Sequence, residues 1–384
     1  MSEISVILSY RDRDIARLQR CLDSLNNQSF KNFQVLFIDY GSSEAYRKPV
    51  EKLVSSYSFC RYVFVYSQGL AFNRAHAMNI GIRLSEGEYL LLSDIDIIHS
   101  KNHLQVLNSH QETNSSIYHQ VYLLPQRFVN YHLVTNYNAI TKHDLTLTDK
   151  ASKGIHFIKK SVLEEIRGYD EFYCFWGVED RDLHARLHQK GIKESWLAPE
   201  QAPLFHQWHP TLRVDKEGFI PDKWWEDMNI YYQINIHRIV RNSDDWARLL
   251  VKEDRIVLSA TERYFDFKVE KKGVSAKVDL ISKLYEGLMK LQDNECLVIL
   301  LANNPAKTHS KILTAFIILV NKIFKVILPS LRIDRCENFY YESPFLSSKY
   351  MLYIIWRLIA FEKIIKDYSI IQDEDSIRIK ICKY

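Results

Sequence analysis

The chain has 384 residues, of which 47% are hydrophobic and 26% are charged, and its formal net charge is +4 at pH 7. This composition is that of an ordinary globular protein and excludes a disordered chain and a repeat array. The length exceeds the size at which a single hydrophobic core usually stops growing, so we expect two domains.

The cysteines and the first residues indicate where the protein works. Six cysteines are scattered along the chain without a C-x-x-C pair, which argues against a zinc knuckle and against a disulfide framework. The chain leads directly from Met1 into the apolar residues 4–8, so we expect no secretory signal. The sequence therefore predicts a cytoplasmic protein.

Short runs of β-branched and aromatic residues alternate with segments of helical period at the start of the chain. The runs predict strands at residues 4–8, 33–38, 62–66 and 89–92. A helix between the first two strands is predicted by one apolar stripe, formed by Ile15, Leu18, Leu22 and Leu25, and residues 73–84 predict a second helix. This alternation is typical of an α/β fold with a parallel sheet, whose ligands bind beyond the carboxyl ends of the strands.

The middle of the chain is less regular. Residues 118–149 are polar and aromatic with weak periodicity, which suggests a loop-rich insertion. After it the pattern predicts a strand at residues 155–158 and helices at residues 161–166 and 179–190, and it becomes mainly helical after Trp224. We therefore expect an α/β domain at residues 1–245 and a mainly helical region at residues 246–384.

Two aspartates follow the fourth predicted strand. Asp94 and Asp96 stand two residues apart, and on an extended chain such side chains point to the same face. Converging carboxylates hold hard divalent cations, and such a cation can bridge the two phosphates of a departing nucleotide diphosphate. The same pattern also fits a solvated turn after a buried strand.

Three acids begin the helix predicted at residues 179–190. Glu179, Asp180 and Asp182 follow Trp176 and Gly177. Acids in a first turn are favoured by the helix dipole and by capping, which would give them no catalytic meaning. The same dipole keeps a carboxylate ionised, as a general base requires. Both interpretations stay open on these residues alone.

Two histidines, His206 and His209, flank Trp208 and precede Pro210. Their spacing can place two imidazoles on one site, although a histidine beside Trp and Pro also fits a half-buried surface position. Together with the two aspartates after the fourth strand, they form a mixed oxygen and nitrogen set. Such a set suits Mn²⁺ or Mg²⁺, with Mn²⁺ favoured by the imidazole.

Four motifs occur in an order that resembles one enzyme family. They are an opening strand with an arginine-containing turn at residues 9–13, the stretch 71–75 with residues 79–81, the aspartates at 94 and 96, and Trp-Gly-Val-Glu-Asp at residues 176–180. Over residues 3–212 the chain resembles glycosyltransferase family 2 and, more closely, the catalytic domains of β-1,4-galactosyltransferases and polypeptide N-acetylgalactosaminyltransferases. The resemblance implies a GT-A fold that binds a nucleotide-sugar.

The resemblance also implies which residues bind the donor. It assigns contacts with the nucleotide-sugar to Ser9, Tyr10, Arg11, Arg13, Asp39, Phe72, Arg74, Asp94, Trp176 and Gly177. Arg11, Arg13 and Arg74 would contact the diphosphate, since the planar fork of arginine suits phosphate oxygens. Arg11 and Arg13 also fit a solvated turn. Asp39 would contact uracil or ribose.

By the same resemblance, six residues carry the metal and the acid–base chemistry. His209 stands at the family's spacing after Glu179 and looks like the metal-binding histidine, with His206 second. Asp94 and Asp96 would complete the metal set. Asp180 looks like the general base, and Glu179 looks like a ligand of the acceptor or of a sugar hydroxyl.

The chain departs from the family pattern at two positions. Val178 stands where a second glycine is usual, and Tyr40 stands where a second aspartate is frequent. These departures leave the donor sugar and the recognition of the base open. Asn79 and Gly81, within the second motif, are expected to shape the helix and the turn rather than to touch the donor.

The last part of the chain is basic and contains two apolar runs. Residues 301–384 hold 13 Lys or Arg against 8 Asp or Glu. The run at residues 312–320 is far shorter than the ~20 residues of a spanning helix. Together with the run at residues 353–361, it reads either as a core helix of a small helical domain or as a basic amphipathic surface that lies on an anionic membrane. The second interpretation would place the protein on the inner face of the plasma membrane.

The sequence as a whole predicts a metal-dependent, inverting glycosyltransferase of bacterial surface polysaccharide synthesis. It would move a hexose, galactose or N-acetylgalactosamine, from a UDP-sugar to a hydroxyl of a glycan or lipid-linked glycan. Inversion is favoured by Asp180, because the retaining relatives carry Asn there. The alternatives are a retaining transferase of the same fold, a catalytically silent protein that binds nucleotide-sugars or carbohydrates, and a nucleotide-sugar hydrolase. Nucleic-acid binding is not expected, since the motif-bearing half has no basic stripe with interleaved aromatics.

Overall fold

The computed structural model describes residues 3–131, 145–150, 153–175, 177–210, 221, 223–264, 274–302, 340–341, 348–372 and 376–383. Contacts within the chain divide it into two compact units that change over between Lys252 and Glu253, and Trp224 belongs to the second unit. The sequence placed this division after residue 245.

The first unit is built on a seven-stranded sheet in the order β10-β6-β9-β4-β1-β2-β3. Strands β1, β2, β3 and β4 form its parallel core, whereas β9 runs antiparallel to both β4 and β6. The strand bounds are β1 Ile4–Tyr10, β2 Phe33–Asp39, β3 Cys60–Phe64, β4 Tyr89–Asp94, β6 Ser115–His119, β9 His156–Lys159 and β10 Lys193–Leu197. The predicted α/β class is confirmed, and the sheet is of the kind that the GT-A resemblance implies.

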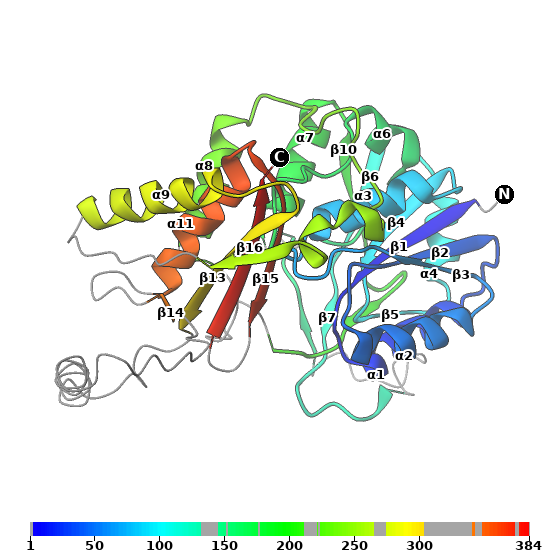
Figure 1. The fold of residues 1–384 in the computed structure, drawn as a ribbon. Helices are drawn as coiled ribbons and strands as arrows, with labels where there is room; N and C mark the ends of the chain where they lie inside the picture. The colour runs from blue at the N-terminus through cyan, green and yellow to red at the C-terminus, as the bar shows by residue number, and fades with distance from the viewer. Residues whose placement is uncertain are drawn as a thin grey trace, which may run out of the picture. The chain divides into compact units, whose positions relative to one another are not determined.

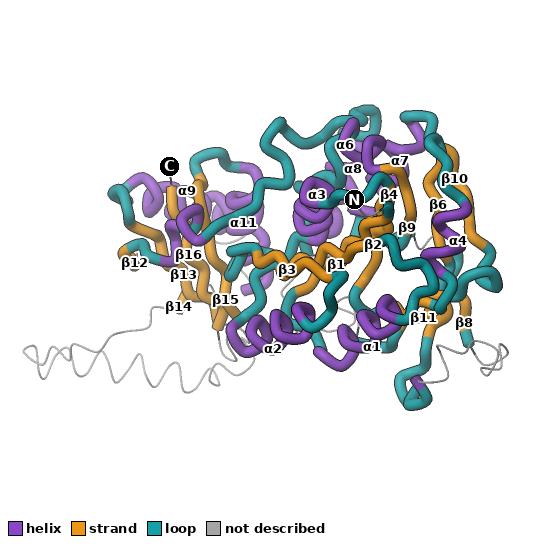
Figure 2. The backbone as a smooth tube through the Cα atoms, turned by 90° about the vertical axis from the view of Figure 1, so that its right-hand side faces the viewer, coloured by secondary structure: helices purple, strands orange, loops and turns teal. Residues whose placement is uncertain are grey.

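Helices cover both faces of this sheet. Their bounds are α1 Ile15–Asn26, α2 Glu44–Ser55, α3 Arg74–Leu84, α4 His103–Ser109, α6 Lys160–Glu165, α7 Glu179–Gln189 and α8 Trp224–Ile234. Figure 2 shows α1 and α2 on one face of β1 to β3 and α3 on the other. Successive side chains of β1 enter two buried clusters in turn, because Val6 and Leu8 pack with α1 whereas Ile7 packs with α3. Burial on both faces explains why residues 4–8 of this strand are mostly apolar instead of alternating with polar residues.

Helix α3 lies unusually close to β1. A Cβ atom on Gly81 would lie 2.3 Å from Cγ2 of Ile7, so this approach requires glycine. Asn79, on the same helix, is fully buried and exchanges hydrogen bonds with the backbone of Tyr169. The prediction that Asn79 and Gly81 shape the fold is confirmed.

A second sheet of the first unit has four strands in the order β5-β11-β7-β8. Their bounds are β5 Ile97–His99, β7 Tyr122–Leu123, β8 Thr146–Leu147 and β11 Leu204–His206. Strands β7 and β8 fall inside residues 118–149, where the sequence predicted a loop-rich insertion, and residues 132–144 of that insertion lie outside the described part. The antiparallel pairing of β11 with β5 sets His206 opposite Ile97. This register brings the end of β11 next to the turn that precedes β5.

The described residues of the second unit form a sheet as well as helices, whereas the sequence predicted a mainly helical region. Its sheet runs β12-β13-β16-β15, with β14 paired to β13, and α9 and α11 pack against it (Figure 1). The bounds are η3 Lys252–Asp254, η4 Ile256–Leu258, β12 Thr261–Tyr264, α9 Val274–Met289, β13 Glu295–Ala302, β14 Tyr340–Tyr341, α11 Ser348–Phe361, β15 Ile365–Gln372 and β16 Ser376–Lys383. The sequence of β16, SIRIKICK, alternates polar and apolar residues with the period of a strand.

The structure describes only one of the two apolar runs of the second unit. The run at residues 312–320 lies outside the described residues. The run at residues 353–361 lies in α11, where Ile355 is fully buried and Trp356 is 4% exposed. This burial favours a core helix over a membrane surface for α11. Among the residues that the structure describes, no helix is both long enough and apolar enough to cross a membrane.

Candidate functional site

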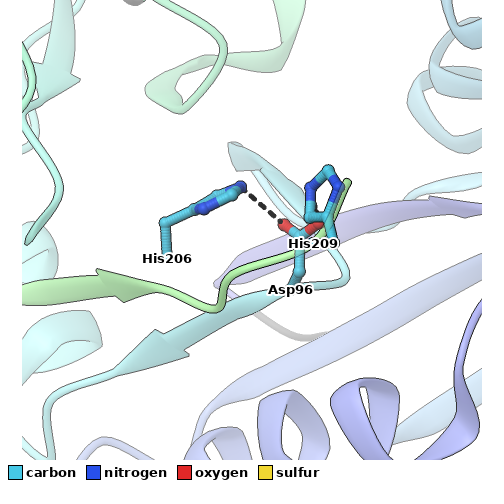
Figure 3. Close-up of side chains that lie close together, drawn as sticks. All are labelled: Asp96, His206 and His209. Atoms are coloured by element: carbon cyan, nitrogen blue, oxygen red, sulfur yellow. Dashed lines mark ion pairs between the residues drawn. The ribbon is translucent and has the colours of Figure 1, made fainter. Parts of the chain in front are cut away.

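Three side chains meet where the parallel core ends and the small sheet begins. Asp96 lies in the turn between β4 and β5, His206 ends β11, and His209 lies in the loop that follows. Nε2 of His209 is 3.1 Å from Oδ2 of Asp96, and Nε2 of His206 is 3.6 Å from Oδ1 of Asp96. Figure 3 shows both imidazoles beside the carboxylate. One ligand atom of each residue lies within 4.8 Å of the others, so the three could hold one metal ion.

The chemistry of this cluster fits a divalent cation. Oδ1 of Asp96 is buried without a hydrogen bond in the described structure, which is uncommon for a carboxylate oxygen. Burial alone would raise the pKa of Asp96, but the hydrogen bond from His209 and the charges of both histidines lower it. The same hydrogen bond raises the pKa of His209, and a cation would bind the neutral form of this imidazole. A carboxylate with two imidazoles suits Mn²⁺ among the hard cations.

Asp94 is not among the three residues of this cluster, and its part in holding the metal stays a prediction. Strand β4 ends at Asp94, and Ile95 and Asp96 form a turn, so the two aspartates do not stand two apart on one extended strand. Asp94 is instead bound by Arg74, whose Nη2 and Nε lie 3.0 and 3.1 Å from Oδ1. Burial raises the pKa of Asp94, although Arg74 opposes this rise.

Arg74 joins Asp94 to Asp180. Its Nη1 is 3.0 Å from Oδ1 of Asp180, in the first turn of α7, and its Nη2 donates to the carbonyl of Gly154 at 3.1 Å. Gly154 lies over both carboxylates, because a Cβ atom there would be 3.2 Å from Oδ2 of Asp180 and 3.7 Å from Oδ2 of Asp94. The fold thus collects these residues from α3, β4, α7 and the segment before β9.

Glu179 lies beside Asp180 at the start of α7 and is buried. Burial and the neighbouring charge of Asp180 raise the pKa of Glu179 to about 7, against the opposing charge of Arg74. A carboxyl group with such a pKa can accept or release a proton near neutral pH. The site therefore offers two adjacent acids for proton transfer, one buried and one paired with arginine.

The loop that leads into α7 holds conformations that glycine prefers. Phe175, Gly177 and Val178 have φ angles of 68°, 91° and 73°. A β-branched residue rarely adopts this left-handed region, and such strain is found mostly at functional sites. Val178 thus has a left-handed backbone at the position where the resemblance implies a glycine. A Cβ atom on Gly177 would lie 2.2 Å from Cζ3 of Trp225. Trp176, a predicted donor ligand, lies outside the described residues.

Arg11 ties together the loops that follow β1, β2 and β3. Its Nη1 donates to the carbonyl of Leu70 at 2.7 Å, its Nη2 to the carbonyl of Ser67 at 2.9 Å, and its Nε to the carbonyl of Tyr40. The guanidinium also lies over the rings of Tyr40 and Phe72. These contacts give Arg11 a structural role, and a contact of Arg11 or Phe72 with the donor stays a prediction.

Asp39 is fully buried, which does not support its predicted contact with uracil or ribose. Its Oδ1 accepts from the amide of Ser42 at 2.9 Å, and its Oδ2 accepts from the hydroxyl of Tyr62 at 2.8 Å. Burial raises the pKa of Asp39. The buried carboxylate therefore stabilises the turn after β2 by accepting a hydrogen bond from the backbone of Ser42.

The remaining predicted donor ligands surround the carboxyl end of β1. Ser9 and Tyr10 are the last residues of that strand, and Ser9 pairs with Asp94 in the sheet register. The hydroxyl of Tyr10 donates to the carbonyl of Arg13 at 2.6 Å and so shapes the loop that carries Arg13. Donor contacts of these three residues stay predictions.

Gly154 is the site residue that the sequence analysis missed. The local signal was a glycine directly before the predicted strand at residues 155–158. Nothing in that neighbourhood indicates that the glycine faces Asp94 and Asp180, because both lie far away in the sequence.

Comparison with known families gives one match that covers the parallel core. Residues 5–176 match the family described as Glycosyl transferase family 2. The match confirms, over those residues, the resemblance to family 2, whereas the closer resemblance to β-1,4-galactosyltransferases and polypeptide N-acetylgalactosaminyltransferases stays a prediction. It covers less than half of the chain and ends before Glu179, Asp180 and His209.

The individual proteins that this chain is similar to have low sequence identity to it. The amylovoran biosynthesis glycosyltransferase AmsB of Erwinia amylovora is 29% identical over 190 residues, which are 46% of this chain and 61% of that protein, so less than two thirds of its length is covered. The structure of S. aureus TarS 1-349 in complex with UDP-GlcNAc matches with a TM-score of 0.44 and 15% identity, over 62% of this chain and 67% of that chain. The catalytic domain of Drosophila β1,4-galactosyltransferase 7 with xylobiose matches with a TM-score of 0.34 and 13% identity, over 51% and 65%.

Proposed function

Because residues 5–176 belong to glycosyl transferase family 2, we propose that this protein transfers a sugar from a nucleotide-sugar donor to a hydroxyl group of a glycan. The observation that carries the proposal is the cluster of Asp96, His206 and His209. Asp96 stands two residues after Asp94, whose carboxylate is hydrogen-bonded by Arg74. Asp94 and its neighbours lie at the carboxyl ends of the parallel strands, where α/β sheets bind their ligands.

We infer the substrates from the motifs and from the curated relative. The motif resemblance implies a UDP-sugar donor that carries galactose or N-acetylgalactosamine. The Erwinia amylovora relative is named for amylovoran biosynthesis, which supports a role in polysaccharide biosynthesis. A glycan or lipid-linked glycan is therefore the proposed acceptor.

The proposed reaction uses the residues of the site in separate roles. Asp96, His206 and His209 would hold Mn²⁺ in preference to Mg²⁺, since the set contains two imidazoles. When bound, such a cation withdraws charge from the departing nucleotide diphosphate. Asp180, with 31% of its side chain exposed, takes the proton of the acceptor hydroxyl, and a single displacement inverts the anomeric centre. Glu179 binds a sugar hydroxyl.

Removal of one metal ligand should abolish the dependence of nucleotide binding on metal. We expect His209→Ala to weaken the binding of UDP in the presence of Mn²⁺ by at least ~10-fold, since even an outer-shell partner of a metal is worth that much. Without metal, the variant and the wild type should bind UDP equally, because the imidazole acts through the ion. Titration calorimetry with UDP, in Mn²⁺ and in EDTA, measures both affinities.

The matched control is His110→Ala, since His110 is exposed at the end of α4. This variant should bind UDP like the wild type in both conditions. Wild-type binding of UDP that is equal in Mn²⁺ and in EDTA would contradict the metal site. An equal loss in both conditions for His209→Ala would show damage to the fold instead of loss of a ligand.

A further inference from the structure

Arg74 makes its hydrogen bonds within the protein. Nε and Nη2 donate to Oδ1 of Asp94 at 3.1 and 3.0 Å, and Nη1 donates to Oδ1 of Asp180 at 3.0 Å. Nη2 also donates to the carbonyl of Gly154 at 3.1 Å. The side chain is only 14% exposed. An arginine that is bonded in this way is oriented before any ligand binds.

The backbone that carries Arg74 is held as firmly as its side chain. Arg74 is the first residue of α3, and the helix is capped by Asn73, whose side chain accepts from the amide of His76 at 2.8 Å. The same side chain donates to the carbonyl of Glu171 at 2.8 Å. The guanidinium lies over the ring of Tyr169, 5.9 Å from its centroid. Arg74 is therefore a fixed point within the site.

The carboxylates around Arg74 repel one another. Burial raises the pKa of Glu179 most, the neighbouring charge of Asp180 raises it further, and Arg74 lowers it. Like charges in a site with little water move apart or take up a proton unless a cation lies between them. Without Arg74, nothing in the contacts described above would fix the distance from Asp180 to Asp94.

We propose that Arg74 is a positioning residue that sets Asp180 at a fixed place relative to Asp94, and that it is not a ligand of the donor diphosphate. This inference rests on the proposed function, because it gives Arg74 a part in that reaction. It differs from the phosphate contact that the motif resemblance implies. Four of the five N–H groups of Arg74 already donate within the protein, so a diphosphate that contacts the guanidinium would compete with charge-assisted hydrogen bonds.

A double-mutant cycle tests the inference. Arg74→Ala should lower kcat by about a hundredfold, as a misplacement of a catalytic group by ~1 Å does. Because Arg74 acts through Asp180, the variant with both Arg74→Ala and Asp180→Asn should be no slower than Asp180→Asn alone, within a factor of about three. The affinity of Arg74→Ala for UDP with Mn²⁺ should stay within about threefold of the wild type, since no diphosphate contact is lost.

Two further variants keep the test independent of folding. Arg74→Lys keeps the charge without the planar fork, so it should recover part of the lost kcat. Arg83→Ala is the matched control, because Arg83 lies near the other end of α3 over the ring of Trp246 and should leave kcat unchanged. Thermal melting shows which variants are folded, and if Arg74→Ala is not, the cycle is run with Arg74→Lys.

Two results would overturn the inference, and they differ from each other. Losses that multiply in the cycle, together with a weaker affinity for UDP, would show that Arg74 contacts the diphosphate while the proposed function stands. A folded wild type that transfers no sugar with Mn²⁺ and acceptor would overturn the proposed function and this inference with it.

Discussion

Asp180→Asn is expected to lower kcat by about 10²- to 10⁴-fold, because Asn cannot accept the proton of the acceptor hydroxyl. Asn resembles Asp in size and caps a helix as well, so the same change would cost at most about 1 kcal/mol of stability if Asp180 only supported the first turn of α7. The two roles of Asp180 therefore predict very different results. Initial rates at saturating donor and acceptor, with UDP and metal binding measured in parallel, distinguish them.

Glu179→Gln is the matched comparison, since Glu179 lies next to Asp180 on the same turn. It should weaken the affinity for the acceptor or for the donor sugar more than it lowers kcat. The base would be Glu179 if Asp180→Asn kept more than about a tenth of the wild-type kcat while Glu179→Gln lost it. That outcome would fit the pKa of Glu179, which burial and the charge of Asp180 raise to about 7.

Acidification from pH 7 to pH 5 is expected to destabilise the first unit by an amount on the order of 5 kcal/mol. The reason is a chain of three buried histidines. Nδ1 of His103 is 3.0 Å from Nδ1 of His99, and Nε2 of His103 is 3.1 Å from Nε2 of His119. Burial lowers the pKa of His99 to about 3 and that of His119 to about 4, and it lowers the pKa of His103 well below its ordinary value.

The direction of this effect follows from the unfolded chain. There each histidine titrates near pH ~6.5, whereas in the folded protein the three imidazoles stay neutral to much lower pH. Below pH ~6.5 the unfolded state therefore binds protons that the folded state does not, and stability falls as the pH drops towards the folded pKa values. From pH ~6.5 to pH 5 each histidine costs about 2 kcal/mol. Buried Asp39 and Glu179, whose pKa values are raised, act in the opposite direction, and buried His156, whose pKa is lowered to about 3, acts in the same direction.

Urea unfolding at pH 7 and at pH 5 measures the difference in free energy. His103→Leu removes one of the titrating groups, so the loss of stability between the two pH values should shrink by about 2 kcal/mol relative to the wild type. His110→Leu, at an exposed position, should leave that loss unchanged. The same pH dependence in His103→Leu and in the wild type would show that the buried histidines do not destabilise the protein in acid.

The α/β core could be predicted because its signals are local. The apolar run at residues 4–8 indicates β1, because a strand that is buried on both faces has apolar residues at most positions. The stripe from Ile15 to Leu25 indicates α1, because a helix that is buried on one face has apolar residues at helical spacing. The alternation of β16 was equally visible. The long apolar runs of the second unit favour helices, and they led to the prediction of a mainly helical region.

The site was predictable only in part because its geometry depends on distant pairings. Asp96, His206 and His209 were expected to meet, but their meeting depends on the register between β5 and β11, which no local pattern shows. The chain turns at Ile95 and Asp96, directly after the strand that ends at Asp94, and the pattern of two aspartates does not show this turn. The ion pair of Arg74 with Asp180 joins residues from two helices.

The most direct test of the proposed function is the release of UDP from a panel of UDP-sugars in Mn²⁺, measured with and without candidate acceptor glycans. Acceptor-dependent release from UDP-galactose or UDP-N-acetylgalactosamine, which is lost in EDTA, is the expected result. Release at the same rate without acceptor would indicate a hydrolase. No release under any combination, from a folded protein that binds UDP with Mn²⁺, would contradict glycosyl transfer.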